Sequence, residues 1–175
     1  MSAPLKLRAM DADDIAVLAA CLQDALVPAS DMRYLPAEKR FVLVANRFCW
    51  EKLPATALDP AAAPAAGEDE KGPFERVHCG LSIEHVRRVQ ARGFDPMGAT
   101  DNERLFEVLS ILPEEGLPAE GLPGAGRDGA VLTLVFAGQV AVRLEVERIE
   151  IFAQDVGEPW PTLWRPHHPF EGETG

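Results

Sequence analysis

Residues 46–51 (NRFCWE) form the segment whose side chains best suit a ligand-binding site. In an extended strand successive side chains point to opposite faces, so Asn46, Phe48 and Trp50 share one face and Glu51 lies on the other. A polar amide in line with two large aromatic rings is typical of an apolar pocket wall that carries a few polar groups. A buried asparagine that bonds to the backbone at a strand end gives the same pattern, and we favour this structural interpretation.

A pocket on this strand would need further polar groups that converge on it. Asp24 and Arg33 precede the strand in the sequence and are the charged residues that we expect nearby. The candidate ligand-binding residues are therefore Asn46, Trp50, Glu51, Asp24 and Arg33.

The histidines do not predict a metal site. His167 and His168 are adjacent in a proline-flanked segment that lacks a suitably spaced acidic or thiol ligand. His78 and His85 are seven residues apart, so in one strand they would point to opposite faces and could not share an ion. We assign no metal.

The three cysteines, Cys21, Cys49 and Cys79, stand in no known catalytic signature, and a free cysteine is commonly a small buried hydrophobe. The sequence also lacks a G-x-S-x-G motif, a Walker A loop and a G-x-G-x-x-G motif after a strand. We therefore assign no catalytic residue and no cofactor, and favour a protein that is not an enzyme. An odd number of cysteines and no signal-like N-terminal segment predict a cytoplasmic protein without disulfides.

Five arginines form the one basic concentration outside the acidic segments. A groove of arginines can bind RNA, but the aromatic residues that usually accompany such a groove are missing here. A salt-bridged sheet surface is the favoured interpretation, and RNA binding through the strand 76–92 is the weaker one. The residues are Arg76, Arg87, Arg88, Arg92 and Arg104.

The N-terminal part predicts a strand and then a helix. Residues 5–10 alternate as in a short strand, and Asp11 or Asp13 is suited to cap a helix N-terminus because its carboxylate accepts backbone N–H bonds. Pro28 should end this helix near Val27. The apolar stripe of the helix consists of Ile15, Leu18, Ala19, Leu22 and Leu26.

The rest of the chain predicts strands. Residues 31–35 and 40–50 flank a four-residue turn and form a hairpin, and residues 75–91 form one long strand that bends at Gly80. Residues 103–112 fit either a helix or a strand, and we favour the strand. Residues 130–136 and 140–151 form a second hairpin. The alternation changes phase after Glu147, which predicts a β-bulge near Glu147-Arg148.

These elements define an α+β domain. We expect one N-terminal helix packed on a curled antiparallel sheet or partial barrel of six to seven strands. No apolar run approaches the roughly 20 residues that a membrane-spanning helix needs. The domain covers residues 1–156, with loop insertions near 54–73 and 113–129, and residues 157–175 are expected to form a flexible acidic tail.

The net charge of −11 comes mostly from three segments rich in proline, glycine or acidic residues. Residues 59–71, 113–129 and 155–175 each carry −3, which leaves −2 for the rest of the chain. The acidity is therefore a property of the expected loops and tail, and it argues against broad nonspecific binding to nucleic acid.

Several separate motifs resemble an uncharacterised bacterial family, domain of unknown function 2948. The resemblance covers most of the chain outside the two insertions and the tail, and it implies a small cytoplasmic bacterial protein without a catalytic role to assign. The residues that carry it are Leu5-Lys6-Leu7, Leu22-Gln23-Asp24-Ala25, Leu35-Pro36, Arg40-Phe41-Val42-Leu43, Asn46-Arg47-Phe48, Trp50-Glu51 and residues 140–149.

Three functions remain open at this point. The first is a noncatalytic binding or adaptor domain, whose partner is unknown and could be another protein or a second copy of the chain. The second is a small-molecule-binding or enzymatic domain that uses the strand Asn46–Glu51. The third, RNA binding, would require the arginines of residues 76–92 to form one surface.

Overall fold

A computed structural model describes residues 3–53, 74–95, 103–115 and 129–162 of the 175-residue chain. The expected insertion at 54–73 lies outside the described residues, as do 116–128 and 163–175. Two boundaries differ from the expectation. Residues 113–115 belong to a strand, and so do residues 157–162, which we expected at the start of the tail.

The first strand and the helix follow the sequence pattern at their N-terminal ends. Strand β1 is Lys6–Ala9 and helix α1 is Ala12–Leu22. Asp11 caps the helix, because its Oδ1 accepts a hydrogen bond of 2.8 Å from the backbone N–H of Asp14. Apolar side chains of α1 at helical spacing, Ile15, Leu18 and Leu22, are buried.

The prediction that α1 continues to Val27 was wrong. The helix ends at Leu22, and Asp24 takes a left-handed backbone conformation with φ of 61°. Leu26–Pro28 then form strand β2, so Leu26 belongs to a strand and not to the helical stripe. Pro28 lies outside the helix, as predicted. The helix ends well before the proline because β2 pairs with two neighbouring strands.

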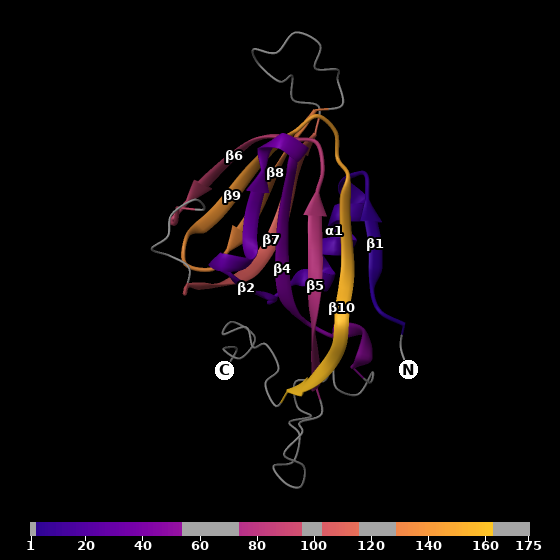
Figure 1. Ribbon diagram of the computed structural model, residues 1–175. Helices are drawn as coiled ribbons and strands as arrows, with labels where there is room; N and C mark the ends of the chain where they lie inside the picture. Colours follow the sequence, from indigo (N-terminus) through magenta and orange to yellow (C-terminus); the bar gives the residue numbers. More distant parts are fainter. Residues whose placement is uncertain (1–2, 54–73, 96–102, 116–128, 163–175) are drawn as a thin grey trace, which may run out of the picture.

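Ten strands form one antiparallel sheet in the described part of the chain (Figure 1), with the order β1-β10-β5-β4-β2-β7-β8-β9-β6 and β3 paired to β4. The expected six to seven strands and the curled or partly closed barrel are corrected, because the path runs openly from β1 to β6 and is not strongly curled. The remaining strands are β3 (Met32–Leu35), β4 (Arg40–Phe48), β5 (Phe74–Ile83), β6 (Val86–Arg92), β7 (Leu105–Glu115), β8 (Ala130–Phe136), β9 (Val140–Val146) and β10 (Ile151–Thr162).

Both predicted hairpins are confirmed. Strands β3 and β4 are joined by a 3-10 turn at Pro36–Glu38 and by Lys39, which has φ of 51°. Strands β8 and β9 pair in register from Ala130 opposite Val146 to Phe136 opposite Val140.

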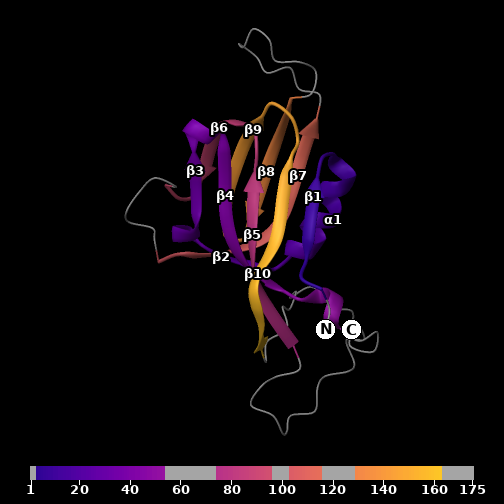
Figure 2. The same cartoon turned by 45° about the vertical axis from the view of Figure 1, so that its right-hand side comes forward.

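The segment 75–91 is two strands and not one. The chain turns at His85, whose φ is 58°. Before this turn β5 lies between β10 and β4, and after it β6 lies beside β9 (Figure 2). Backbone hydrogen bonds from Glu84 to Glu150 and from Glu147 to His85 fix this turn. Alternation alone could not show the break, because β5 and β6 each continue a period of two.

The prediction of a bulge near Glu147-Arg148 was wrong. The chain passes there from one strand to another, since β9 ends at Val146 and β10 begins at Ile151. A bulge does occur in β7, where the register with β8 shifts between Val108 and Ser110. It explains the ambiguous pattern of residues 103–112, for which the strand prediction is confirmed. Phe106, Val108 and Ile111 are buried, whereas Leu105, Leu109 and Leu112 are exposed.

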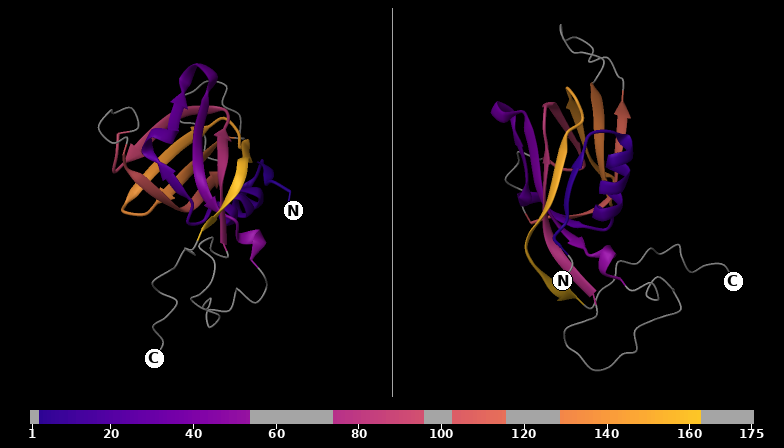
Figure 3. Two further views of the ribbon diagram at one scale, coloured as in Figure 1. Left: turned by 60° about the horizontal axis from the view of Figure 1, so that its bottom comes forward. Right: turned by 90° about the vertical axis from the view of Figure 1, so that its right-hand side faces the viewer.

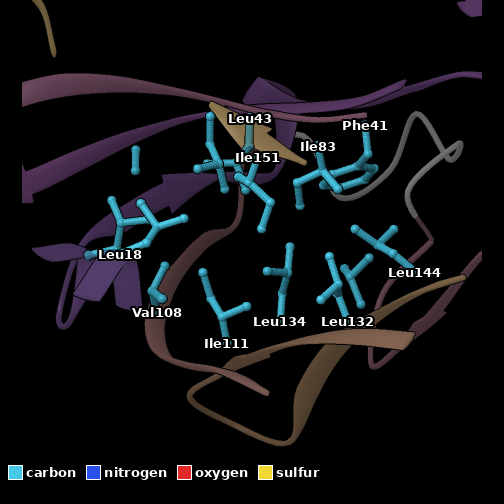
Figure 4. Close-up of a cluster of buried hydrophobic side chains, with 14 of the residues drawn as sticks. Leu18, Phe41, Leu43, Ile83, Val108, Ile111, Leu132, Leu134, Leu144 and Ile151 are labelled. Atoms are coloured by element: carbon cyan, nitrogen blue, oxygen red, sulfur yellow. The ribbon is translucent and has the colours of Figure 1, made fainter. Parts of the chain in front are cut away.

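The hydrophobic core lies between two parts of the sheet (Figure 4). Phe41, Leu43, Ile83 and Ile151 come from β4, β5 and β10, and they face side chains from β7, β8 and β9. Helix α1 contacts β1, β4 and β7 and closes one side of this core (Figure 3). The facing side chains are Val108, Ile111, Leu132, Leu134 and Leu144.

The cap of α1 gives a first prediction. Asp11→Ala should lower the free energy of unfolding by about 1 kcal/mol, because the N–H of Asp14 loses its acceptor. Chemical denaturation measures this, with Asp13→Ala as the matched control in the same helical turn. Equal losses in the two variants would show that the hydrogen bond adds nothing beyond a nearby negative charge.

Candidate functional site

A buried ion cluster lies at the end of the core where β4, β5 and β10 continue past the helix. Its centre is Arg47, which is 0% exposed. Asp155 binds it with two oxygens, at 2.7 Å from Nε to Oδ1 and 2.6 Å from Nη2 to Oδ2. Glu51 binds it with two more, at 3.0 Å from Nη1 and 2.8 Å from Nη2.

Every N–H group of the Arg47 guanidinium has an acceptor. Four are taken by the two carboxylates, and the fifth donates from Nη1 to the backbone oxygen of Phe48 at 3.4 Å. A guanidinium has five donors, so no donor is left for an incoming ligand. Arg47 therefore organises the site without being able to bind an anion itself.

The strand register places the cluster. Arg47 follows Phe41, Leu43 and Ala45 on the core face of β4, since alternate residues of a strand share a face. Asp155 holds the equivalent place on β10, opposite Cys79 of β5. Glu51 reaches the cluster from a 3-10 turn at Trp50–Lys52, directly after β4.

The cluster also holds the N-terminal segment. The backbone N–H of Leu5 donates to Oδ2 of Asp155 at 2.8 Å, and the N–H of Asp155 donates to the oxygen of Leu5 at 2.9 Å. These bonds extend the pairing of β1 with β10 by one residue pair beyond Lys6.

Both carboxyl groups of the cluster are charged at neutral pH. Burial alone would raise the pKa of Asp155, but the hydrogen bonds from Arg47 and from the Leu5 backbone outweigh it and lower the pKa. The pKa of Glu51 is likewise lowered, because the bonds from Arg47 outweigh its burial. One guanidinium with two carboxylates leaves a net charge of −1.

A cavity of about 130 Å³ lies beside this cluster. Charged groups from β10 and from the turn after β4 meet apolar side chains in its wall. The lining residues are Ala3, Pro4, Cys49, Glu51, Lys52, Val77, Asp155, Gly157, Glu158 and Pro159.

The predicted residues Asn46, Trp50 and Asp24 are together on the other face of β4. The backbone oxygen of Asn46 accepts a hydrogen bond of 3.0 Å from Arg76, and Trp50 donates from Nε1 to the backbone oxygen of Gln23 at 3.2 Å, next to Asp24. Burial lowers the pKa of Arg76, and the charges of Asp24 and Glu107 oppose that shift.

Aromatic packing around Phe48 lies at the centre of the group formed by Asn46, Trp50 and Asp24. Phe48 is fully buried there, with its ring centroid 4.6 Å from that of Trp50 and 5.7 Å from that of Phe74. Asn46 Oδ1 is buried and accepts no hydrogen bond from the residues that the structure describes. The structural interpretation expected Asn46 to bond to the backbone, and its side-chain oxygen makes no such bond within the described residues.

Two of the five predicted residues lie elsewhere. Glu51 belongs to the Arg47 cluster, which is on the opposite face of β4. Arg33 lies on β3 and pairs with Val42 of β4. Val42 is four residues from Asn46, or about 13 Å along β4. The sequence pattern missed Arg47 and Asp155. The available signal was Arg47 itself, which shares the alternate positions of the buried Phe41, Leu43 and Ala45.

The five arginines of the RNA hypothesis are spread over three strands or strand ends. Arg76 lies on β5, Arg88 and Arg92 lie on β6, and β5 and β6 are not neighbours. Arg87 and Arg88 face Glu147 and Glu145, at 3.7 and 3.9 Å.

The cysteines form no disulfide and no metal-binding group in the described ranges. Cys21, Cys49 and Cys79 are free thiols, and burial raises the pKa of each, for Cys79 to about 12. Within these ranges no group of three or more His, Cys, Asp or Glu side chains could hold a metal ion, and no helix is long and apolar enough to cross a membrane.

In its described residues the chain is an α+β protein with one helix on an open, ten-stranded antiparallel sheet, and a buried arginine–carboxylate cluster lies at the end of its core. The chain belongs to the family described as protein of unknown function DUF2948, whose model matches residues 5–168. The resemblance seen in the sequence is thereby confirmed. Neither the curated proteins nor the solved structures contain a match.

Removal of the central charge tests the cluster. Arg47→Met should lower the free energy of unfolding by about 3–5 kcal/mol, because it leaves Asp155 charged and buried without its partner. Denaturant melts measure the loss, and Arg143→Met, at an exposed ion pair on β9, should cost less than about 1 kcal/mol. The double variant Arg47→Met/Asp155→Leu should be more stable than Arg47→Met alone. If it is less stable, the orphaned carboxylate is not the cause.

The lowered pKa of Asp155 sets a pH dependence. A carboxyl group whose folded pKa is depressed stabilises the fold above its unfolded pKa, which is about 3.9 for aspartate, and loses this contribution as pH falls through the folded pKa. Asp155→Asn should therefore show a shallower loss of stability below about pH 4 than the unmodified chain. Urea melts from neutral to acidic pH test this, with Asp13→Asn as the exposed control. Parallel curves for Asp155→Asn and the unmodified chain would contradict it.

Proposed function

We propose that this chain is a noncatalytic binding domain that docks a partner protein on the outer face of β4, β5 and β10. One observation carries the proposal, namely that the exposed side chains Val44 of β4 and Phe152 and Val156 of β10 share the outer face of the sheet on the two strands that flank β5. The solvent face of an antiparallel sheet is ordinarily polar, so adjacent exposed apolar groups there indicate an interaction surface.

The register places these side chains on adjacent rows of the outer face, with β5 between Val44 and the other two. Val44 pairs with Gly80, which pairs with Gln154, and the flanking rows contain Phe152 on one side and Val156 on the other. Gly80 has no side chain, and a Cβ placed there would lie 3.8 Å from Cγ2 of Val156. The middle of the surface is therefore low and open to a partner, and we call Val44, Gly80, Phe152 and Val156 the outer apolar patch.

Aromatic and basic side chains border the outer apolar patch. The ring centroids of His78 and Trp160 are 4.7 Å apart at one end, and the Arg8 guanidinium lies 5.6 Å from the ring centroid of Phe152 at the other. Tryptophan and arginine are the residue types most enriched among side chains that dominate binding energy. The composition of the border therefore favours a protein partner.

The charge of the border selects the kind of partner. The outward positions of β1, β3, β4 and β5 carry basic side chains, while the nearest carboxylates, Glu84 and Glu150, are bound by Arg40 and Arg8. A second copy of this face would bring like charges together in a symmetric dimer, which is unfavourable. We therefore assign the surface to a different protein with apolar side chains inside an acidic border. The basic residues are Lys6, Arg8, Arg33, Arg40 and Arg76.

The thiols support the noncatalytic part of the proposal. A nucleophilic cysteine needs a lowered pKa, because the thiolate is the reactive form. Burial raises the pKa of Cys21, Cys49 and Cys79, which disfavours that form in all three.

Quantitative affinity capture tests the docking surface. The immobilised chain is exposed to an extract of the cells that produce it, beside Val44→Glu/Val156→Glu and the matched control Val17→Glu/Leu112→Glu, which changes two exposed apolar residues elsewhere. We expect a protein that the unmodified chain and the control retain and that the patch variant loses at least tenfold. That protein, once purified, must bind the chain directly with the same ranking.

Two outcomes would overturn the proposal. One is that no protein distinguishes the patch variant from the control. The other is that the captured protein is the chain itself and that sedimentation shows a dimer which the patch variant dissociates. Val44→Thr/Val156→Thr repeats the comparison without new charges if the glutamate variant does not fold.

A further inference from the structure

The cavity beside the Arg47 cluster is a second feature, on the other face of β4 from the outer apolar patch. We propose that it binds a small protonated alkylamine, with the ammonium group at Glu51 and the alkyl chain against Val77, Pro4 and Pro159. This site is independent of protein docking, because no residue of the outer apolar patch lines the cavity.

The charge of the wall calls for a cation. Glu51, Asp155 and Glu158 line the cavity, and Arg47, which lies behind the first two, neutralises one of them. Lys52 is the basic residue among the described lining residues, and its ammonium group is already bound to Glu75. The wall therefore keeps an excess of negative charge that its own basic groups do not balance.

The same contacts exclude an anion. Arg47 would be the natural partner of a carboxylate or phosphate, but it is 0% exposed and all of its N–H groups already donate to protein oxygens. An anionic ligand would meet carboxylates without a free guanidinium. Buried charges are unfavourable unless they are paired, so the wall discriminates by charge sign.

Glu51 is suited to receive the ammonium group. Its side chain is 40% exposed, although both oxygens accept hydrogen bonds from Arg47. Two carboxylate oxygens offer about four acceptor positions, of which Arg47 occupies two. The free positions let Glu51 bind an ammonium group without giving up Arg47.

The size and the remaining wall set the rest of the ligand. A cavity of about 130 Å³ holds more than a water molecule, whose share of liquid volume is about 30 Å³. Val77 is buried and contributes an apolar surface together with the two prolines. A short alkyl chain matches this combination. The amine could be a free small molecule or the side chain of a lysine.

Binding of n-butylammonium to the purified chain tests the proposal, by titration calorimetry and by amide chemical shifts. Neutral n-butanol and anionic butyrate have similar chain lengths and serve as matched ligands. We expect n-butylammonium to bind at least tenfold more tightly than either. Shift changes should centre on the residues that line the cavity. Nα-acetyl-lysine methylamide distinguishes the two sources, since a lysine site accepts it as tightly and a site for a free amine does not.

Charge variants assign the binding to this wall. Glu51→Gln should weaken n-butylammonium at least tenfold, and Glu145→Gln, at a half-buried ion pair on β9, should leave it unchanged. Glu158→Gln weakens binding by a smaller factor and replaces Glu51→Gln if that variant does not fold. The proposal is overturned if butanol or butyrate binds as well as the amine, if no amine binding is detected, or if neither wall variant weakens it.

Discussion

The end of the core depends on a single buried guanidinium. Arg47 joins β4 to β10, to the turn that follows β4 and, through Asp155, to the segment before β1. Burial of the two charged groups of Arg47 and Asp155 is unfavourable in itself, and only near-complete hydrogen bonding offsets the loss of water. The geometry supplies that bonding, because two carboxylates and one backbone oxygen accept all of the Arg47 donors.

This constraint explains why the two faces of β4 differ in character. The register of β4 is constrained at Arg47, because a shifted strand would separate the guanidinium from Asp155 and leave both charged groups buried without a partner. On the outer face the partly buried Arg76 donates to the backbone oxygen of Asn46, and the charges of Asp24 and Glu107 act on it. There, aromatic packing around Phe48 gives way along the strands to the exposed valines Val44 and Val156.

Local signals in the sequence predicted local structure well. Asp11 caps the helix, the turn before Lys39 joins β3 to β4, and the strand at 103–112 is present, because each depends on residues close in sequence. The break at His85 was missed because a turn with φ of 58° at a non-glycine residue leaves no sign in the alternation of apolar residues. The number of strands was underestimated because β5 was joined to β6, β9 was joined to β10, and β2 was assigned to the helix.

The site was harder to predict than the fold. Arginine is normally found at the surface, so its place in the buried pattern of β4 received no weight. Its main partner, Asp155, is 108 residues away in the sequence, in a segment that composition had placed with the acidic tail. Asn46, Trp50 and Asp24 do come together, and Glu51 binds Arg47 on the opposite face, where strand alternation had placed it.

The position of β1 has a consequence for how the protein is made. β1 is the terminal strand of the sheet and pairs with β10, so residues from opposite ends of the chain meet there. On a ribosome that adds about 5–20 residues per second, roughly 7–30 s separate the synthesis of the two strands. During that interval β1 waits without its partner, and the sheet gains its outer strand only after β10 has been made.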